Sequence, residues 1–265
     1  MLEQRDTTGT SAVSDRADDH ATLMTAMGEP VGFSASDAPL PPLSAPLPRA
    51  RFDAAAKRAL DIVASAVMLL ALLPLILIVA VLVRLDSPGP AFFKVDRIGR
   101  RGRRLRMLKF RKMHDDASGI ALTTHEDDRL TRIGAFLAKS KLDELPQLWH
   151  ILRGDMSLVG PRPETADFVA HHRHEYDEIL TVRPGLVGFS QIAFLSEGRI
   201  LNEEDPLTHY VSAILPQKVT LDLMYAREHT VLMDLKILVW SMVAVLARRQ
   251  VAVNRQTGQM NLRRR

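Results

Sequence analysis

The sequence contains no cysteine among its 265 residues. This absence excludes disulfide bonds, thiolate metal sites and cysteine nucleophiles, so any covalent chemistry must use another side chain. The absence of cysteine is also compatible with a protein that functions in the reducing cytosol. Because 46% of the residues are apolar and 25% are charged, the chain has enough apolar material for one folded domain.

The first part of the chain is poor in aromatic residues and ends in a proline-rich run, APLPPLSAPLPRA. Such a segment cannot bury enough apolar surface to form a core, so residues 1–50 are predicted to be a disordered tail. A cleaved secretory signal needs a basic region followed by an apolar run. The beginning of this tail has neither, so no such signal is expected.

A long apolar run follows the tail, within residues 51–86. From Ile62 to Val83 there is no charged residue, and the run exceeds the roughly 20 residues that a helix needs to cross a bilayer. Pro74 lies inside it, where a proline removes a backbone donor and clashes with the preceding turn. Two topologies are compatible with this pattern: a kinked helix that crosses the membrane once, and a re-entrant helix that breaks at Pro74.

Basic residues flank the apolar run on both sides, which favours cytoplasmic placement of both ends and hence the re-entrant form. Residues 87–247 are predicted to form the main domain, on the cytoplasmic face. Its basic stretch, KVDRIGRRGRRLRMLKFRKM, suits anionic lipid headgroups or phosphate-bearing substrates, with a solvated surface as the alternative. A second apolar stretch, from Ile237 to Ala247, is too short to span and is expected to be interfacial or core. Residues 248–265 are predicted to be a basic tail.

Two adjacent acids stand between leucines in the segment KLDELPQL. The apolar residues after them recur at helical spacing, so Asp143 could cap a helix with Pro146 in its first turn. Alternatively, Ser140 and Asp143 would form a capping box. Thr131 is predicted to cap the preceding short helix, and Gly154 to end the helix that follows the acids.

The segment GPRPE places Arg162 between two prolines, which stiffen the backbone and remove two donors. A guanidinium presented on a stiff loop suits phosphate oxygens, although most loops of this composition are turns. The histidines at 171, 172 and 174 have mixed spacing and acidic neighbours, so they are interpreted as an exposed helix face and not as a metal site.

Several long motifs occur in a fixed order: FFKVDRIGRRG, KFRKM, LDELPQLWHILRGDMSLVGPRPE, RPGLVGFSQ and YAREHTVLMDLKIL. In this respect the chain, from about Lys57 to Leu246, resembles the bacterial sugar transferases. These are monotopic phosphoglycosyl transferases that use polyprenyl phosphate. The resemblance implies an α+β, mostly helical, membrane-associated domain with a re-entrant helix broken at Pro74 and interfacial amphipathic helices. It also implies a place on the cytoplasmic face of the bacterial inner membrane.

The resemblance also implies the chemistry. A UDP-sugar would donate its sugar 1-phosphate to polyprenyl (undecaprenyl) phosphate and release UMP, as the first membrane step of exopolysaccharide, capsule or O-antigen synthesis. Asp143 would be the nucleophile and a ligand of Mg²⁺, and Glu144 would assist as base or ligand. Arg162 and Lys109 would contact phosphate, with Arg111 as a third candidate.

The sequence departs from the family before the acid pair. Where the family often has an arginine and a serine, this chain has Ala138 and Lys141, so Lys139 or Lys141 would have to substitute for the arginine. The sugar stays open, and so does the oligomeric state, with a homodimer among the options. Two other functions would also use the basic stretch: a membrane-anchored adaptor with a basic interaction surface, and a tethered nucleic-acid binder. Neither explains the acid pair together with the GPRPE loop, so no nucleic-acid partner is expected.

Overall fold

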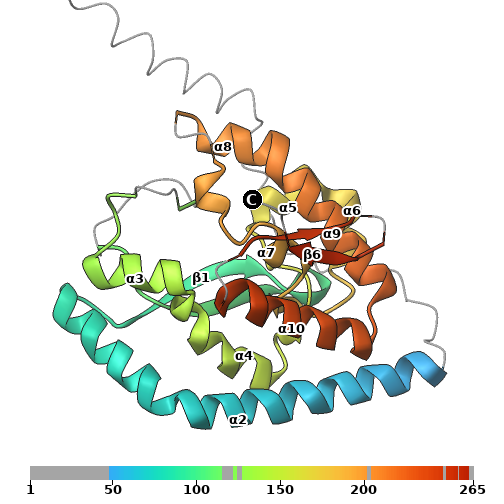
Figure 1. Cartoon of the computed structure of the whole chain (residues 1–265), viewed down its shortest axis with the longest axis horizontal. Helices are drawn as coiled ribbons and strands as arrows, with labels where there is room; N and C mark the ends of the chain where they lie inside the picture. Colours follow the sequence, from blue (N-terminus) through green and yellow to red (C-terminus); the bar gives the residue numbers. More distant parts are fainter. Residues whose placement is uncertain are drawn as a thin grey trace, which may run out of the picture. The chain divides into compact units, whose positions relative to one another are not determined.

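A computed structural model describes residues 48–114, 122–123, 127–201, 204–246, 249–255 and 257–262. All of them belong to one unit, formed by residues 37–265. The tail predicted for residues 1–50 lies outside the described residues except for its last three. In the described part helices predominate and the strands are short (Figure 1), so the mostly helical α+β class is confirmed.

The longest element is α2 (Pro48–Asp86), which contains the apolar run and continues through Pro74. Figure 1 shows that α2 bends in its second half, the part that holds this proline. A proline costs the helix one hydrogen bond and crowds the preceding turn, which bends a helix without necessarily ending it. The break expected at Pro74 is therefore a bend in a continuous helix, and the re-entrant topology remains a prediction.

The two faces of α2 differ. One face packs on the rest of the unit and buries Asp61, Ser65, Ile76, Val79 and Val83. The opposite face exposes large apolar side chains, including Leu70 at 74% and Leu85 at 78%. Within the described part of the chain, α2 is the one helix that is long and apolar enough to cross a membrane.

Polar side chains fasten the first half of α2 to the domain. Lys57 Nζ lies 2.5 Å from Oδ2 of Asp234 in α10 (Val231–Leu246). Arg58 donates to the carbonyl oxygens of residues 151 and 152 in α4 (Leu148–Arg153), at 2.7 and 2.8 Å. Oδ1 of Asp61 accepts from Ser157 Oγ at 3.0 Å and from the Leu158 amide at 2.9 Å, both in β3 (Ser157–Val159).

The far end of α2 is fastened to the same unit. The Arg111 guanidinium is buried and donates to the carbonyl oxygens of Val83, Ser87 and Pro88, the Ser87 contact being 2.7 Å. Oδ2 of Asp86 accepts from the amide at the start of α3 (Arg132–Ser140), that of Ile133, at 2.9 Å. Both ends of the apolar helix are therefore tied to one polar domain.

Strands β1 (Phe92–Ile98) and β2 (Arg104–Phe110) form an antiparallel hairpin, closed by the short turn η1 (Arg100–Gly102). Successive side chains of a strand point to opposite faces. Phe93 pairs with Lys109 and Arg97 pairs with Leu105, so these four side chains share one face of the hairpin. The other face carries Lys94, Arg104 and Arg106.

The core surrounds a small parallel pair, in which β3 is hydrogen-bonded to β4 (Gly185–Val187). Leu148, Ile151 and Met156 are completely buried beside it, and α7 (Phe189–Ala193), α9 (Leu215–Glu228) and α10 complete the cluster. A Cβ atom on Gly185 would lie 2.1 Å from the Gly160 amide nitrogen. Glycine at this position therefore permits the close approach that sets the loop after β3.

The remaining helices pack around this core. Thr131 caps α3 as predicted, because its Oγ1 accepts from the Gly134 amide at 2.9 Å. The histidine segment forms parts of α5 (Ala166–His171) and α6 (Arg173–Ile179), and the described residues contain no group of three or more potential ligands for a metal ion. Three short elements follow: η3 (Glu197–Arg199), α8 (Pro206–His209) and η4 (Tyr210–Ile214).

The C-terminal segment differs from the predicted basic tail. It forms an antiparallel pair, β5 (Val251–Val253) and β6 (Met260–Leu262), in which Val251 is buried against the core. The pair forms because a turn with Gly258 at positive φ lets the apolar side of the strand fold back. In α10, Ile237 is buried whereas Val239 and Met242 are exposed. The second apolar stretch thus has both a core face and an exposed apolar face.

We expect Asp61→Ala to destabilise the fold by about 1–3 kcal/mol, because it leaves two buried donors of β3 without their acceptor. The melting temperature in detergent micelles should fall by roughly 3–10 °C. Asp177→Ala is the control, since Asp177 is exposed and pairs only across the surface with Arg173. Equal melting temperatures for the two variants would contradict the anchoring role of Asp61.

Candidate active site

The acid pair lies in a tight turn between two helices. Residues Leu142–Gln147 form the 3-10 helix η2, with Asp143 and Glu144 in its first turn and Pro146 inside it. Lys141 precedes the turn at φ 60° and provides no side-chain cap. Both capping interpretations of the acids were therefore wrong: Ser140 Oγ donates instead to the Phe136 carbonyl at 2.8 Å. Gly154, at φ 96°, ends α4 as predicted.

Asp143 is held in the interior by η2, which packs against β2. Its side chain is 5% exposed, and Oδ2 lies 4.0 Å from Nζ of Lys112. Oδ1 is buried and has no hydrogen-bond partner among the described residues. A buried oxygen without a donor is costly unless a ligand supplies a partner. Oδ1 of Asp143 is therefore a candidate contact for a bound ligand.

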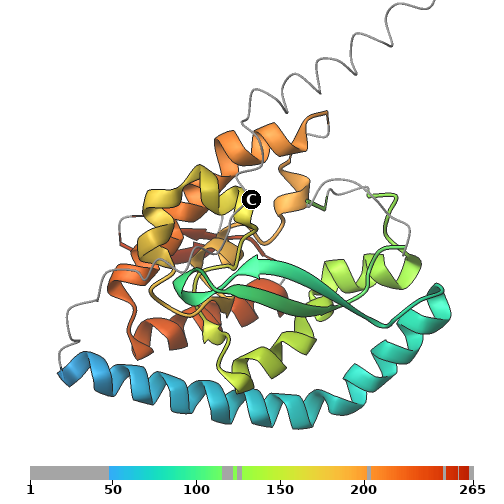
Figure 2. The same ribbon diagram turned by 180° about the vertical axis from the view of Figure 1, so that it is seen from behind.

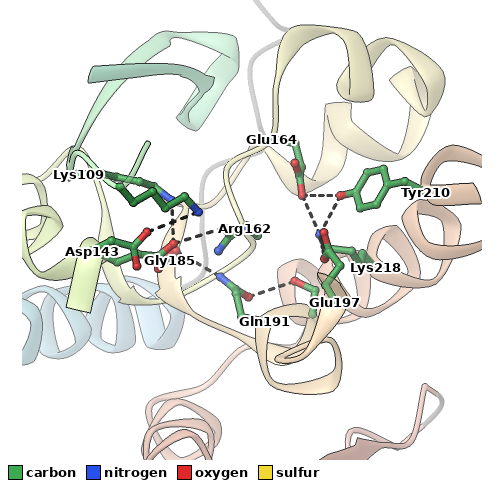
Figure 3. A network of polar contacts seen from close by, with 12 residues as sticks. Lys109, Asp143, Arg162, Glu164, Gly185, Gln191, Glu197, Tyr210 and Lys218 are labelled. Atoms are coloured by element: carbon green, nitrogen blue, oxygen red, sulfur yellow. Dashed lines mark hydrogen bonds and ion pairs between the residues drawn. The ribbon is translucent and has the colours of Figure 1, made fainter. Parts of the chain in front are cut away.

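The Glu144 carboxylate is bound by two cationic side chains. Its Oε1 accepts from Lys109 Nζ at 2.8 Å and from Arg162 Nη2 at 3.3 Å. Figure 3 shows Lys109 and Arg162 approaching the acid pair from different elements, β2 and the loop after β3. Glu144 thus connects the hairpin, η2 and the loop.

The two acids have opposite pKa shifts. Burial raises the pKa of Asp143, and the neighbouring Glu144 charge adds to this shift, while Lys109 and Lys112 oppose it. Burial alone would also raise the pKa of Glu144, but Lys109 and Arg162 hold it below its usual value. Glu144 therefore stays ionised as the counter-ion of Lys109 and Arg162, whereas Asp143, with an unpartnered Oδ1, is the acid that can contact a ligand.

The loop of Arg162 is fixed on both sides. The Gly160 amide donates to the Val187 carbonyl at 2.9 Å, and the Gly185 amide donates to the Pro161 carbonyl at 2.8 Å. These bonds continue the pairing of β3 and β4 into the loop. The guanidinium of Arg162 is consequently presented on a rigid backbone with a third of its side chain exposed.

A buried polar cluster lies behind the loop (Figure 3). Glu164, two residues after Arg162, accepts from Tyr210 OH at 3.2 Å, and its Oε1 lies 3.2 Å from Lys218 Nζ. Lys218 also donates to Glu197 at 3.0 Å. Burial alone would lower the pKa of Lys218, but the two carboxylates raise it, so the lysine stays charged and holds the loop from behind.

The structure brings four of the five predicted site residues together: Asp143, Glu144, Lys109 and Arg162. Arg111 does not join them, since its guanidinium serves the end of α2. Arg111 lies just beyond the end of β2, so strand alternation, which would place it on the side of Lys109, no longer determines its direction, and its contacts with the end of α2 do. Arg111 therefore has a structural contact here, and its predicted phosphate role stays a prediction.

Three further cations lie near the acids, and two of them, Lys112 and Arg97, were not predicted individually. Lys112 faces Asp143, and the Lys141 charge interacts with both acids and with Arg162. Arg97 interacts electrostatically with Glu144 and with Glu164. Arg97 could have been predicted from the hairpin register, because that register puts Arg97 on the same face as Lys109. Of the two lysines considered in place of an arginine at Ala138, Lys141 lies beside the pair and Lys139 lies on the exposed side of α3.

The donor set fits a magnesium ion held jointly with a ligand. Mg²⁺ is commonly bound through one or two carboxylates together with substrate phosphates. Asp143 supplies one such carboxylate, and the unpartnered Oδ1 is an acceptor suited to a hard cation. The described residues do not form an all-protein cage.

Together, four cations surround the two acids: Lys109, Lys112, Lys141 and Arg162. This arrangement has more positive charge than its own carboxylates balance, and it is suited to an anionic ligand such as a diphosphate. A carboxylate within such a site can attack phosphorus, because the cations reduce repulsion between two anions.

Comparisons with known proteins find relatives that cover most of the chain. The chain is 38% identical over 206 residues to a UDP-glucose:undecaprenyl-phosphate glucose-1-phosphate transferase of Caulobacter vibrioides, covering 76% of this chain and 73% of the relative. It is 37% identical over 205 residues to exopolysaccharide production protein PSS of Rhizobium leguminosarum bv. phaseoli, covering 74% and 98%.

A third relative, a UDP-N-acetylgalactosamine-undecaprenyl-phosphate N-acetylgalactosaminephosphotransferase of Aeromonas hydrophila, is 40% identical over 141 residues. This match covers 51% of the chain but only 33% of that longer relative. The family model of the bacterial sugar transferases matches residues 52–248, which include most of α2, both hairpin strands, the acid pair and the Arg162 loop. The chain therefore belongs to the bacterial sugar transferase family.

Proposed function

We propose that this protein transfers a sugar 1-phosphate from a UDP-sugar to polyprenyl phosphate, releasing UMP, through a covalent intermediate on Asp143. The observation that carries the proposal is the buried Asp143 carboxylate with one unpartnered oxygen, surrounded by four cations. The names of the relatives support the same reaction. They differ in the sugar, glucose or N-acetylgalactosamine, so the sugar of this chain stays open.

The reaction takes two displacements. A carboxylate oxygen of Asp143 attacks the phosphorus that bears the sugar, and the bond from that phosphorus to the UMP oxygen breaks, so UMP leaves with the electron pair. An acyl phosphate joins Asp143 to the phosphosugar. An oxygen of polyprenyl phosphate then attacks the same phosphorus, and the carboxylate leaves unchanged.

The surrounding residues bind and orient the diphosphate. Lys109 and Arg162 already meet at Glu144, so they need little reorganisation to donate hydrogen bonds to phosphate oxygens. Lys112, which faces Asp143, would keep the attacking carboxylate ionised near an anionic substrate. Glu144 holds these cations in position, which is a positioning role. The role as base or ligand that the resemblance implies stays a prediction.

Mg²⁺ bound by Asp143 and the substrate phosphates would neutralise charge on the diphosphate and so favour departure of UMP. In this arrangement Asp143 needs both oxygens, and the unpartnered Oδ1 provides the second one. The lysines and Arg162 would contact the remaining phosphate oxygens.

The placement of α2 supports a monotopic topology. Lys57, Arg58 and Asp61 tie its first half to the domain, and Arg111 and Asp86 tie its end to the same domain. A helix fastened at both ends to one polar body cannot place those ends on opposite sides of a bilayer. We therefore infer a re-entrant α2, with the catalytic domain on the cytoplasmic face of the inner membrane and α10 lying in the interface.

The proposal as a whole is tested with the protein in nanodiscs and a panel of UDP-sugars. UMP release that depends on polyprenyl phosphate and Mg²⁺ is expected for at least one sugar. A membrane adaptor would release no UMP with any of them, and that result would refute the enzymatic proposal.

We predict that Asp143→Asn abolishes both turnover and the covalent adduct, because an amide is a poor nucleophile. Glu144→Gln should lose turnover but retain some adduct, since it weakens the positioning of Lys109 and Arg162 and leaves the attacking group intact. Intact-protein mass spectrometry after incubation with UDP-sugar and Mg²⁺, without polyprenyl phosphate, measures the adduct. An adduct that persists in Asp143→Asn would refute the assignment.

We predict that Arg162→Lys lowers kcat/KM for the UDP-sugar by roughly tenfold or more, because lysine keeps the charge but lacks the planar fork that binds two phosphate oxygens. Arg183→Lys is a matched control, because Arg183 lies in a neighbouring loop and donates to the Gly154 carbonyl. Unchanged kinetics for Arg162→Lys would mean that this loop is only a turn.

The topology can be tested directly because the chain has no native cysteine. Single cysteines introduced in place of Ala54 and Pro90, which flank the apolar run, should both react with a membrane-impermeant thiol reagent only from the cytoplasmic side. Leu73→Cys, on the exposed apolar face of α2, should be protected by lipid. Labelling of the two flanking positions from opposite sides would establish a crossing helix.

A further inference from the structure

A second basic site lies on the opposite side of the hairpin from the acid pair. It is a groove of about 590 Å³ between the hairpin and α4, with Leu105, Leu108 and His150 among its lining residues. The Leu108 amide donates to Nε2 of His150 at 3.1 Å, which fixes the hairpin against α4. The groove is therefore a feature of two packed elements and not of a mobile loop.

Strand alternation separates this groove from the proposed catalytic site. Lys109 and Arg97 point to the face that holds the acids, whereas Lys94, Arg104 and Arg106 point to the other face. The diphosphate site proposed above uses none of the cations of the groove. Their concentration on this face needs a separate explanation.

The groove has a surplus of positive charge. Four cations contribute to it, with two carboxylates nearby: Lys94, Arg104, Arg106 and Arg153, with Asp96 and Asp155. Asp96 pairs with Arg104 at 2.6 Å and lies 3.8 Å from Arg106, and Asp155 pairs with Arg153 at 2.9 Å. These acids orient the arginines but leave the groove cationic, which suits a phosphate-bearing ligand.

One helix, α4, separates the groove from α2. α4 packs against α2 and lies between it and the hairpin in both views (Figures 1 and 2). Trp149 and Arg153 share one face of α4, one turn apart, and line the groove together, with Trp149 49% exposed. Tryptophan beside arginine is typical of positions at the membrane–water boundary, where an indole is amphipathic and cations meet lipid phosphates.

We propose that this groove binds the phosphodiester headgroup of an anionic bilayer lipid. The arginines and Lys94 contact the phosphate, and the Trp149 ring packs against the glycerol and upper acyl region. Occupation of the groove ties the hairpin, which also carries Lys109 on its other face, to the membrane surface. The bilayer then helps to set the height of the catalytic face above the lipid.

The test uses the full chain in detergent micelles with Trp240→Phe, so that Trp149 is the sole tryptophan. Its fluorescence is followed while short-chain phosphatidylglycerol, short-chain phosphatidylcholine or inorganic phosphate is added. A saturable change with phosphatidylglycerol alone is expected. Arg106→Gln combined with Arg153→Gln should weaken that binding by roughly 30-fold, since each basic residue near a membrane surface contributes about a factor of five.

The matched control is Arg173→Gln combined with Arg227→Gln, which removes the same charge from exposed positions on α6 and α9. It should bind like the parent. Lys94→Glu provides a second groove variant should the double variant fold poorly, and it should also weaken binding. The proposal is overturned if phosphatidylcholine gives the same saturation, if inorganic phosphate binds equally well, or if the control weakens binding as much as the groove variant. The readout is lipid binding, so failure of the proposed transferase reaction would not affect it.

Discussion

The carboxylate of Glu144 joins three segments that are far apart in the sequence. Through Lys109 it holds the β1–β2 hairpin, through Arg162 it holds the loop after β3, and its own turn carries Asp143. Removing one partner of such a buried group leaves the others uncompensated, which costs more than the pair itself contributes. The geometry around Asp143 depends on this contact. In the proposed reaction, which uses Asp143 as the single nucleophile, this contact gives the second acid a positioning role.

The same domain determines how α2 lies. Its buried face is fastened by Lys57 to Asp234 near the beginning and by Arg111 near the end, and its other face exposes a continuous apolar surface. A single helix therefore does two tasks: it contributes the lipid-facing surface, and it closes the core over β3 and α4. Because Arg58 and Asp61 bind the segment that leads to Arg162, the position of α2 and the position of the Arg162 loop are mechanically connected.

Much of this could be predicted from the sequence, because long motifs carry the acid pair, Lys109 and Arg162 together. The apolar run identified α2, and its proline identified the bend. The sequence could not distinguish an α-helical cap from the 3-10 turn η2, because both tolerate acids and a proline. It could not place Arg111 or Lys112 either, since the direction of a side chain just beyond a strand depends on tertiary contacts. The C-terminal strands were missed because each is a short, mostly apolar triplet with polar neighbours, which resembles a tail in the sequence. Only the folded core, which buries Val251, makes the strand recognisable.

The hairpin then has a consequence for how lipid and nucleotide substrates could meet. Its period of two places one set of cations toward Asp143 and another set toward the groove beside α4. A displacement of the hairpin relative to the bilayer would therefore move Lys109 relative to Glu144, because one rigid pair of strands carries both faces. In the proposed reaction the acceptor reaches Asp143 from the membrane while the nucleotide approaches from water, so the site has to remain at a fixed depth. Two sets of contacts limit movement of the site: α2 is fastened at both ends, and His150 fixes the hairpin against α4.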